Sequence, residues 1–352
     1  MFRVICLLPL ALTLVTGSKL CPHHCLCYGN SEMVDCRARG FTHIPHGIPH
    51  GTWLLDLSEN KLSQLRSSTF TGIWTLRILL LQNSGIQVLQ SRALSSLSFL
   101  EKLDLSHNDL HSLTQDFSYG LTALKDLRLA HNSLERLETR SFAHLESLEK
   151  LDLSHNHIRV IQCGAFHGLT SLKQLNLAWN QLPMLHSGVL TMQQRLSILL
   201  LGHNNISNID TEAFTPLQSL SLLGLEANQL GNLKFKTFLN LQTPSTHLQL
   251  SENPWVCDCE LHRIFSKILH VRRLHIDDYW NITCHSPPLL AGASPALMDS
   301  QLCIAETATV LVITATVMVT VVAAIAMAER NRRKKQLNLG KQGNEPETEH
   351  HK

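Results

Sequence analysis

The stretch LEKLDLSHN occurs at residues 100–108 and again, unchanged, at residues 148–156. Each copy holds an aspartate, a serine and a histidine close together: Asp104, Ser106 and His107, then Asp152, Ser154 and His155. These residue types build hydrolase triads, and histidine with carboxylates also binds zinc. The fold of the chain therefore depends on whether this stretch is a reactive site or a structural unit.

The stretch is one unit of a repeat that runs through the middle of the chain. Asparagines recur at multiples of 24 residues, with a last copy one residue late: Asn60, Asn108, Asn132, Asn156, Asn180, Asn204, Asn228 and Asn253. Ser84 occupies the remaining position of this series. Around each asparagine the frame is L-x-x-L-x-L-x-x-N-x-L. This period and frame resemble those of leucine-rich repeats, over roughly residues 21–303.

The resemblance implies an α/β repeat fold: a leucine-rich-repeat solenoid whose curved parallel β-sheet forms a horseshoe, with about nine repeats over residues 52–253. In each repeat the L-x-L core is a short strand with leucines pointing inward and the other residues facing the concave surface. One repeat cannot bury its leucines alone, so neighbouring repeats must stack. The asparagine column resembles the family's ladder, and Ser84 is a departure from it.

Catalysis does not fit this arrangement. Ser106 and His107 are neighbours on a strand, so their side chains point in different directions, whereas a triad needs its members within hydrogen-bond reach. We therefore expect a protein that is not an enzyme, with no cofactor.

A histidine column offers a second candidate site. His107, His131, His155 and His203 share one position of the repeat. On consecutive strands, side chains lie about 4.8 Å apart, and a parallel row does not converge on one zinc ion. We expect no metal site, and a pH-sensitive surface stays open as an alternative.

Cysteines flank the repeat array on both sides, at Cys21, Cys25, Cys27 and Cys36 and at Cys257, Cys259, Cys284 and Cys303. Four cysteines allow three pairings, so spacing leaves the connectivity open. The two groups resemble the cysteine caps of extracellular leucine-rich-repeat proteins. That resemblance implies first-to-third and second-to-fourth disulfides: Cys21–Cys27, Cys25–Cys36, Cys257–Cys284 and Cys259–Cys303. We expect caps over residues 19–51 and 254–303, with a short helix over residues 260–269 in the second.

Two further features belong to the ectodomain. Cys163 is left over on the convex side, and we expect it to be buried in packing, with an intermolecular disulfide as the alternative. The sequons Asn205-Ile-Ser and Asn281-Ile-Thr predict two glycosylation sites.

The two ends of the chain predict its compartment. Residues 1–18 have the arginine, the apolar run and the small residues of a secretory signal peptide. Residues 307–328 carry no charge and, as a helix of roughly 33 Å, would cross a bilayer. A basic cluster follows at the start of the tail, residues 329–352. Since basic flanks stay cytoplasmic, we expect a single-pass type I protein of the plasma membrane. The net charge of +2 gives no sign of nucleic-acid binding.

The predicted concave face has two parts. Charges alternate in sign from strand to strand in its centre, as in Glu101, Lys125, Glu149 and Lys173, so that part is expected to pair with itself. Beyond it lies an apolar cluster, which is the candidate contact for a protein partner: Trp179, Ile198, Leu200 and Leu222. A weaker apolar strip comprises Trp53, Leu54, Ile78 and Leu80.

The membrane segment adds an expectation about the partner. Three residues separate Cys303 from the predicted span, which favours a partner in the same membrane. Small residues recur every fourth position of the span and are candidates for helix packing: Thr316, Thr320, Ala324 and Ala328.

The layout resembles that of the single-pass cell-surface leucine-rich-repeat proteins of animals. The resemblance implies an adhesion protein or co-receptor that binds a protein partner through its concave face. An auxiliary subunit of an ion channel or receptor in the same membrane is the first alternative, and an innate-immune ligand sensor without its own signalling domain is the second. The sequence leaves the partner's identity, the tissue and the oligomeric state open.

Overall fold

The computed structural model describes residues 21–29, 32–67, 69–114, 116–295 and 300–342. The predicted signal peptide, residues 1–18, lies outside the described residues, as does the end of the predicted tail. The chain divides into two compact units, Met1–Ala296 and Leu297–Lys352.

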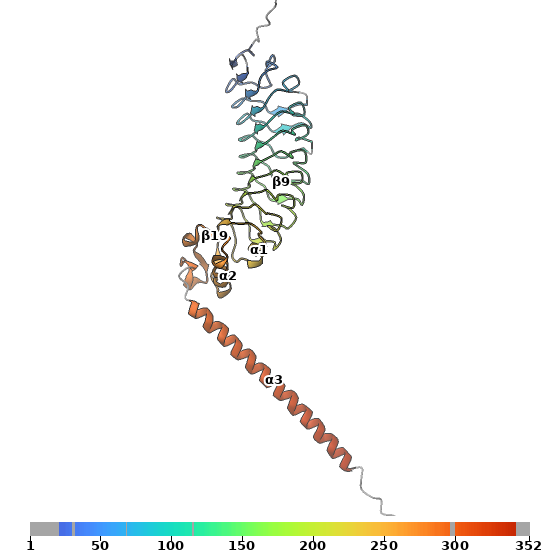
Figure 1. The fold of residues 1–352 in the computed structure, drawn as a ribbon, viewed down its shortest axis with the longest axis vertical. Helices are drawn as coiled ribbons and strands as arrows, with labels where there is room; N and C mark the ends of the chain where they lie inside the picture. Colours follow the sequence, from blue (N-terminus) through green and yellow to red (C-terminus); the bar gives the residue numbers. More distant parts are fainter. Residues whose placement is uncertain (1–20, 30–31, 68, 115, 296–299, 343–352) are drawn as a thin grey trace, which may run out of the picture. The chain divides into compact units, whose positions relative to one another are not determined.

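The first unit is a solenoid built on a long, mainly parallel sheet (Figure 1). The L-x-L segments form its strands, because alternate residues of each are buried leucines such as Leu103 and Leu127. Successive strands pair in register at 24-residue steps, as Leu127 with Leu151 shows. The strands, in sheet order, are β1 (Leu26–Tyr28), β2 (Met33–Asp35), β3 (Leu54–Asp56), β5 (Ile78–Leu80), β7 (Lys102–Asp104), β8 (Asp126–Arg128), β10 (Lys150–Asp152), β12 (Gln174–Asn176), β14 (Ile198–Leu200), β16 (Leu222–Gly224), β17 (Thr246–Gln249) and β19 (Leu274–Ile276). Only the β1–β2 pair within this described sheet is antiparallel, and it belongs to the N-terminal cap.

The convex side holds short strand pairs over a buried aromatic column. The pairs are β4 (Gln64–Leu65) with β6 (Val88–Leu89), β9 (Arg136–Leu137) with β11 (Val160–Ile161), and β13 (Met184–Leu185) with β15 (Asn208–Ile209). A further pair, β18 (Trp255–Val256) with β20 (Cys284–Ser286), belongs to the C-terminal cap. Phe142 and Phe166 are fully buried and stack with ring centroids 5.9 Å apart. These rings fill the space between the sheet and the convex turns.

The asparagine column forms a hydrogen-bonded ladder. Asn156 donates from Nδ2 to the carbonyl oxygens of Leu129 and Leu153, both at 3.0 Å, and its Oδ1 accepts from the Leu134 amide at 3.1 Å. Its side chain thus ties two adjacent repeats together and satisfies backbone groups that are buried inside the turn. The same set of bonds recurs along the column.

Ser84 keeps the ladder continuous in a different way. Its Oγ donates to the Leu57 carbonyl at 3.0 Å, while its own carbonyl accepts the Leu62 amide at 2.8 Å. In the other repeats an asparagine Oδ1 takes the equivalent amide, so the shorter serine is accommodated by a backbone acceptor.

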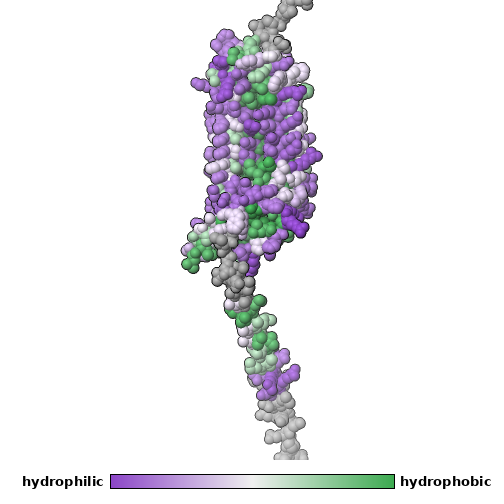
Figure 2. All heavy atoms as spheres, turned by 60° about the vertical axis from the view of Figure 1, so that its left-hand side comes forward, coloured by the Kyte–Doolittle hydropathy of each residue, from purple (hydrophilic) through white to green (hydrophobic). Residues whose placement is uncertain are grey.

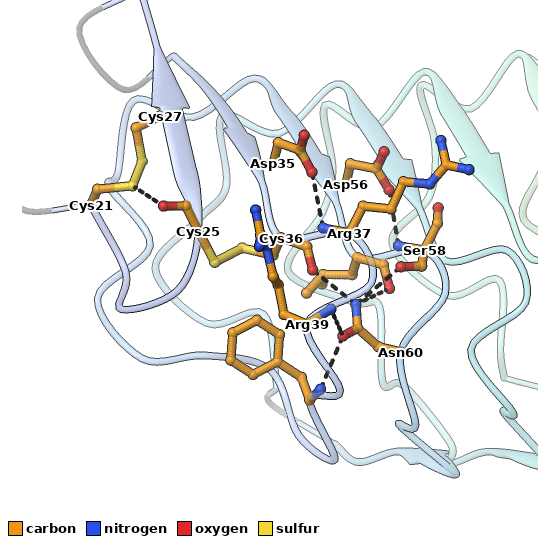
Figure 3. The surroundings of a disulfide bond; sticks show 12 residues. Cys21, Cys25, Cys27, Asp35, Cys36, Arg37, Arg39, Asp56, Ser58 and Asn60 are labelled. Atoms are coloured by element: carbon orange, nitrogen blue, oxygen red, sulfur yellow. Dashed lines mark hydrogen bonds between the residues drawn. A yellow bond between two sulfur atoms is a disulfide. The ribbon is translucent and has the colours of Figure 1, made fainter.

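Disulfides close both ends of the solenoid. Figure 3 shows Cys21 bonded to Cys27 and Cys25 bonded to Cys36, next to the first ladder residue, Asn60. At the other end Cys257 is bonded to Cys284. These are pairs that the family resemblance implies, and Cys259 and Cys303 are also disulfide-bonded.

The C-terminal cap contains the helix expected there, one residue longer at each end. Helix α2 (Cys259–His270) begins after Asp258, whose carboxylate accepts the Leu261 amide at 2.8 Å. Phe265 and Ile268 on its inner face are buried, and Phe265 packs edge-on against Trp255. The remaining short helices of this unit are α1 (Phe235–Leu239), η1 (Tyr279–Asn281) and η2 (Pro288–Leu290).

Cys163 is exposed, which corrects the expectation that it is buried in packing. It shares a position of the repeat with Thr139 and Ser187, in a solvent-facing convex turn. Thr139 Oγ1 donates to the Cys163 carbonyl at 3.2 Å, and Cys163 Sγ lies 3.9 Å from the Ser187 carbonyl. The position therefore selects small polar side chains that bond along the surface.

The second unit is helix α3 (Ser300–Gln342). Within the described part of the chain, this is the one helix long and apolar enough to cross a membrane, over Thr309–Lys334. The span expected at residues 307–328 falls on this helix, which continues through the basic cluster. The candidate packing residues Thr316 and Thr320 bond their hydroxyls back to the carbonyls of Ile313 and Val317, so neither hydroxyl is left without an acceptor in lipid. Ala324 and Ala328 follow at the same four-residue spacing.

Candidate functional site

The concave face of the main sheet carries ion pairs across its central strands. Glu101 pairs with Lys125 and Glu149 with Lys173, each at 2.9 Å between nitrogen and oxygen. The predicted alternation of charge is therefore confirmed at these positions. The hydrogen bond from Lys125, together with its positive charge, lowers the pKa of Glu101 below the ordinary value for a glutamate. Since the side chains are exposed, each pair stabilises the fold only modestly.

A hollow lies next to this paired region. It has a volume of about 530 Å³, and strands β8 to β16 contribute its walls. Arg128, Lys150 and Asp152 stand on one side, and Ile198, Leu200 and Leu222 form an apolar wall on the other. Figure 2, which brings the side of the main sheet forward, shows hydrophobic patches that interrupt a largely hydrophilic surface.

The apolar wall occupies positions that are polar in the central repeats. Leu200 pairs in register with Asn176 on β12, and the preceding strands place Asp152, Arg128 and Asp104 at the same position. Folding therefore does not require a leucine there. Ile198, Leu200 and Leu222 are all partly exposed, so the wall is open to solvent.

Trp179 does not belong to this wall, although the sequence grouped it with the three aliphatic residues. It follows β12 rather than lying on it, in a turn where the backbone has φ of 57°. Its side chain is 50% exposed, and its indole lies between the rings of His155 and His203. The predicted apolar cluster thus divides into two parts: the three aliphatic residues form the wall of the hollow, and Trp179 belongs to a separate aromatic stack.

Trp179 is part of a row of five stacked rings, which we call the aromatic row. Its members are His107, His131, His155, Trp179 and His203. Adjacent ring centroids lie 3.8 to 5.2 Å apart and adjacent planes are within about 10° of parallel. Every member has a positive φ because the chain turns sharply just before the ladder asparagine. The histidines recur every 24 residues except at position 179, where the series has a tryptophan. The sequence could have indicated the row in this way, because an aromatic residue stands at the one position that lacks a histidine.

The residues of the D-x-S-H-N stretch have structural roles in the aromatic row, the ladder and the turn between them. Asp152 Oδ1 accepts hydrogen bonds from the backbone amide and the hydroxyl of Ser154, at 3.0 and 2.7 Å. The histidine stacks in the row and the asparagine belongs to the ladder. Each residue of the stretch therefore has a role in closing the turn.

His131 at the centre of the row has a lowered pKa. The ring faces are covered by its two neighbours although its edge is exposed, so partial burial disfavours the charged form most strongly. Repulsion from His107 and His155 lowers the pKa further, and Asp152 opposes the shift. Among the described residues, no three His, Cys, Asp or Glu side chains are grouped so that they could hold a metal ion.

The predicted glycosylation sites and the weaker apolar strip both have solvent-exposed members. Asn205 and Asn281, the sequon asparagines, are both exposed. In the weaker apolar strip Trp53 is 38% exposed, while Leu54, Ile78 and Leu80 are partly buried on β3 and β5.

The sequence is similar to known leucine-rich-repeat proteins over part of its length. The leucine-rich-repeat family model matches residues 53–110, 74–134, 99–158 and 122–182. Human amphoterin-induced protein 1 is 38% identical over 84 residues, which cover 24% of this chain and 17% of that protein. Human leucine-rich repeat-containing protein 4 is 35% identical over 63 residues, 18% of this chain and 10% of that protein. The chain thus spans less than a fifth of the length of these curated relatives.

Solved structures match over most of the chain. The crystal structure of human 5T4, also named trophoblast glycoprotein, is similar with a TM-score of 0.60 and 26% identity, over 81% of this chain and 98% of that one. A chain of the octameric complex of latrophilin 3, Unc5D and the leucine-rich-repeat part of FLRT2 gives a TM-score of 0.57 at 24% identity, over 79% and 98% of the two chains. The latter likeness concerns the fold alone.

Proposed function

We propose that this chain, a leucine-rich-repeat protein with one helix able to span a membrane, is a non-catalytic cell-surface recognition protein. It binds a protein partner through the concave face and acts as an adhesion protein or co-receptor. The observation that carries the proposal is the hollow of about 530 Å³ with its apolar wall of Ile198, Leu200 and Leu222. An exposed apolar wall next to a polar, self-paired surface is the usual composition of a protein-binding hot spot.

The size and the chemistry of the hollow favour a protein. The hollow is broad enough for several side chains, and its apolar wall rewards the burial of aliphatic or aromatic groups. The ion pairs on the neighbouring strands form a polar rim, which excludes water without adding much affinity. Trp179, exposed beside the wall, offers a second contact to the same partner.

The comparisons support a protein partner in general terms. The relatives include receptor-like and adhesion-type leucine-rich-repeat proteins, among them human amphoterin-induced protein 1. In the octameric complex, the leucine-rich-repeat part of FLRT2 is assembled with latrophilin 3 and Unc5D, so the same fold serves protein–protein association there.

The substitution Leu200→Asp tests this proposal. Aspartate stands at the same position of the repeat in Asp104 and Asp152, so the strand tolerates it, while the wall gains a charge. Multimers of the secreted ectodomain carrying Leu200→Asp are expected to lose at least tenfold in staining of partner-bearing cells, because a buried unpaired charge costs more than about 1.4 kcal/mol. Leu80→Asp, at the same position on β5, is the matched control. Equal staining by both variants and the unchanged ectodomain would refute the proposal.

The orientation and the site of action are part of the proposal. The predicted signal peptide, the exposed sequon asparagines and the basic cluster after the span favour a type I protein with its repeats outside the plasma membrane. We expect glycans on Asn205 and Asn281, outside the apolar wall. Enzymatic removal of N-glycans should increase the electrophoretic mobility of the protein in two steps, one for each sequon.

A second candidate function is an auxiliary subunit of a channel or receptor in the same membrane. The few residues between Cys303 and the span, and the small residues of α3, favour close contact with another membrane protein. Proximity labelling on live cells would compare the full-length protein with a version whose span is polyleucine. Labelled partners that vanish with the exchange would favour this second function, and partners that persist would place recognition on the ectodomain.

A further inference from the structure

The C-terminal cap carries a loop in which every residue is apolar. Residues 287–291 read PPLLA, and we call them the apolar loop. Two hydrogen bonds close its base: the Cys284 amide donates to the Ala293 carbonyl at 2.8 Å, and the Gly292 amide donates to the Cys284 carbonyl at 2.9 Å. Since Cys284 is also bonded to Cys257, the base of the loop is fixed to the folded cap.

The tip of the apolar loop is more exposed than any other leucine-bearing part of this unit. Leu289 is 97% exposed, whereas Leu26, the next most exposed leucine in the described part of the unit, is 48% exposed. Pro287, Pro288 and Ala291 are exposed as well. Leu289 therefore adds nothing to the core, and covering it would be favourable. A single exposed leucine is common on protein surfaces, so the surroundings of the loop decide what covers it.

The chain around the apolar loop carries almost no charge. Residues 286–328 include the loop and the predicted span, and their charged side chains are Asp299 and Glu306 alone. No lysine or arginine occurs in this segment, so it lacks the basic residues that bind acidic lipid headgroups. The loop is therefore suited to an apolar phase, independently of the charge of the lipids.

The covalent path from the cap to the membrane is short. Cys303 is disulfide-bonded and belongs to α3, and the apolar span of that helix begins six residues further on, at Thr309. Six helical residues rise about 9 Å. The headgroup layer of a bilayer is about 5–8 Å deep on each side. Whatever the angle between the cap and α3, Cys303 is therefore held near the outer edge of the headgroups.

The backbone of the apolar loop is compatible with surroundings that contain little water. Pro287 and Pro288 have no N–H group that could be left unsatisfied. The Leu290 amide donates to the Pro287 carbonyl at 2.9 Å, and the Ala291 amide donates to the Pro288 carbonyl at 3.4 Å. Unpaired backbone donors are costly in lipid, so a tip that satisfies most of its own donors enters the membrane interface at a low cost.

We propose that the apolar loop is a membrane contact: it enters the interfacial layer of the bilayer that α3 spans, and Leu289 reaches the edge of the hydrocarbon. A lipid surface is favoured over a protein because the short link to the span keeps a bilayer next to the cap at all times, whereas a protein would have to be recruited. Held at two points, the cap would not swing freely about the span. This inference goes beyond the proposed recognition function and rests on the proposed single-pass topology.

The contact does not include the exposed tryptophan of the same cap. Trp280 is 75% exposed and directly precedes Asn281, the predicted glycosylation site of this cap. A glycan is bulky and has to remain in water. We therefore assign the contact to the apolar loop and not to Trp280.

Photocrosslinking of the full-length protein tests the contact. The photoreactive residue p-benzoylphenylalanine replaces Leu289, Val317 within the span or Val88 on the convex strand β6, one position at a time. Each protein is placed in nanodiscs of phosphatidylcholine whose acyl chains carry an alkyne, and after irradiation a dye coupled to the alkyne reveals lipid attached to the protein. We expect lipid adducts from positions 289 and 317 but only background from Val88, which is 50% exposed and lies many repeats from the cap.

A charge placed in the loop provides a matched comparison. In the protein with the photoreactive residue at position 289, Ala291→Asp should lower the yield of lipid adduct about twofold to fivefold, because a charged side chain is disfavoured at the lipid interface. Ala291→Asn is similar in size but uncharged and should have a smaller effect. An unchanged yield in Ala291→Asp would overturn the membrane contact.

The outcomes separate the loop from its premise. Adducts from position 317 without adducts from position 289 would overturn the membrane contact and leave the span standing. No adducts from either position would refute the span itself, and the inference with it. If irradiation of live cells links position 289 to a protein in place of lipid, a protein covers the loop and the membrane contact is wrong. None of these results depends on the apolar wall, which Leu200→Asp tests separately.

Discussion

The asparagine ladder makes a quantitative prediction for Asn156→Ala. The Asn156 side chain is 4% exposed and makes three bonds to carbonyl oxygens and one to an amide. Alanine would leave the Leu134 amide without its partner, whereas the Leu129 and Leu153 carbonyls would each keep a bond from a neighbouring ladder asparagine, Asn132 or Asn180. At about 1–3 kcal/mol for the one unsatisfied buried amide and about 1 kcal/mol for the lost bonds to carbonyls, we expect a loss of about 2–4 kcal/mol in the free energy of unfolding.

Ser84→Ala is the matched comparison within the same column. Ser84 donates to the Leu57 carbonyl at 3.0 Å, but the Leu62 amide is satisfied by the Ser84 backbone carbonyl and survives the substitution. The expected cost is therefore only about 1 kcal/mol.

Urea unfolding of the secreted ectodomain, followed by circular dichroism, measures both variants. With an m-value of about 3 kcal/mol/M, Asn156→Ala should lower the midpoint by about 0.7–1.3 M, and Ser84→Ala by about 0.3 M. If Asn156→Ala costs no more than Ser84→Ala, the side-chain ladder does not hold adjacent repeats together and the reasoning fails.

Three further predictions concern the aromatic row, the free thiol and the membrane helix. The pKa of His131 is lowered on folding, so its contribution to stability is complete above the ordinary histidine pKa of about 6.5 and is lost as the pH falls from that value through the lower pKa of the folded state. Urea midpoints measured between pH 7.5 and 5 should therefore decrease, and less steeply in His131→Gln; parallel slopes would contradict this. Cys163 should react with a maleimide without denaturant, and Cys163→Ser should abolish that labelling, because the disulfide-bonded cysteines do not react. Thr320→Leu combined with Ala324→Leu should weaken self-association of the span in a membrane-helix dimerisation assay, and an unchanged signal would exclude packing through this ridge.

The repeat architecture was predictable because its signal is repeated. Nine copies of one frame specify the strands, the ladder and the buried leucines. A copy that departs from the frame, such as the one with Ser84, can still be assigned from the spacing of the others. The C-terminal cap helix was expected within one residue of its ends as part of the cap that the family resemblance implies, and the structure shows Asp258 as its N-cap. These features depend on local pattern and on contacts between neighbouring repeats.

The candidate site was less predictable because it depends on where side chains point after the turn. Trp179 was grouped with Leu200 because the two residues were assigned to consecutive strands of the concave face, but its positive φ directs the indole into the aromatic row. The exposure of Cys163 likewise follows from hydrogen bonds within a convex turn rather than from residue type.

The measurement that tests recognition through the apolar wall most directly is proximity labelling on live cells. Full-length protein with an extracellular labelling enzyme would be compared with its Leu200→Asp and Leu80→Asp variants at matched surface expression. We predict that a defined set of cell-surface proteins is labelled by the unchanged protein and by Leu80→Asp but lost with Leu200→Asp. The same set labelled by all three would contradict the account, because the wall of the hollow would then not be the contact.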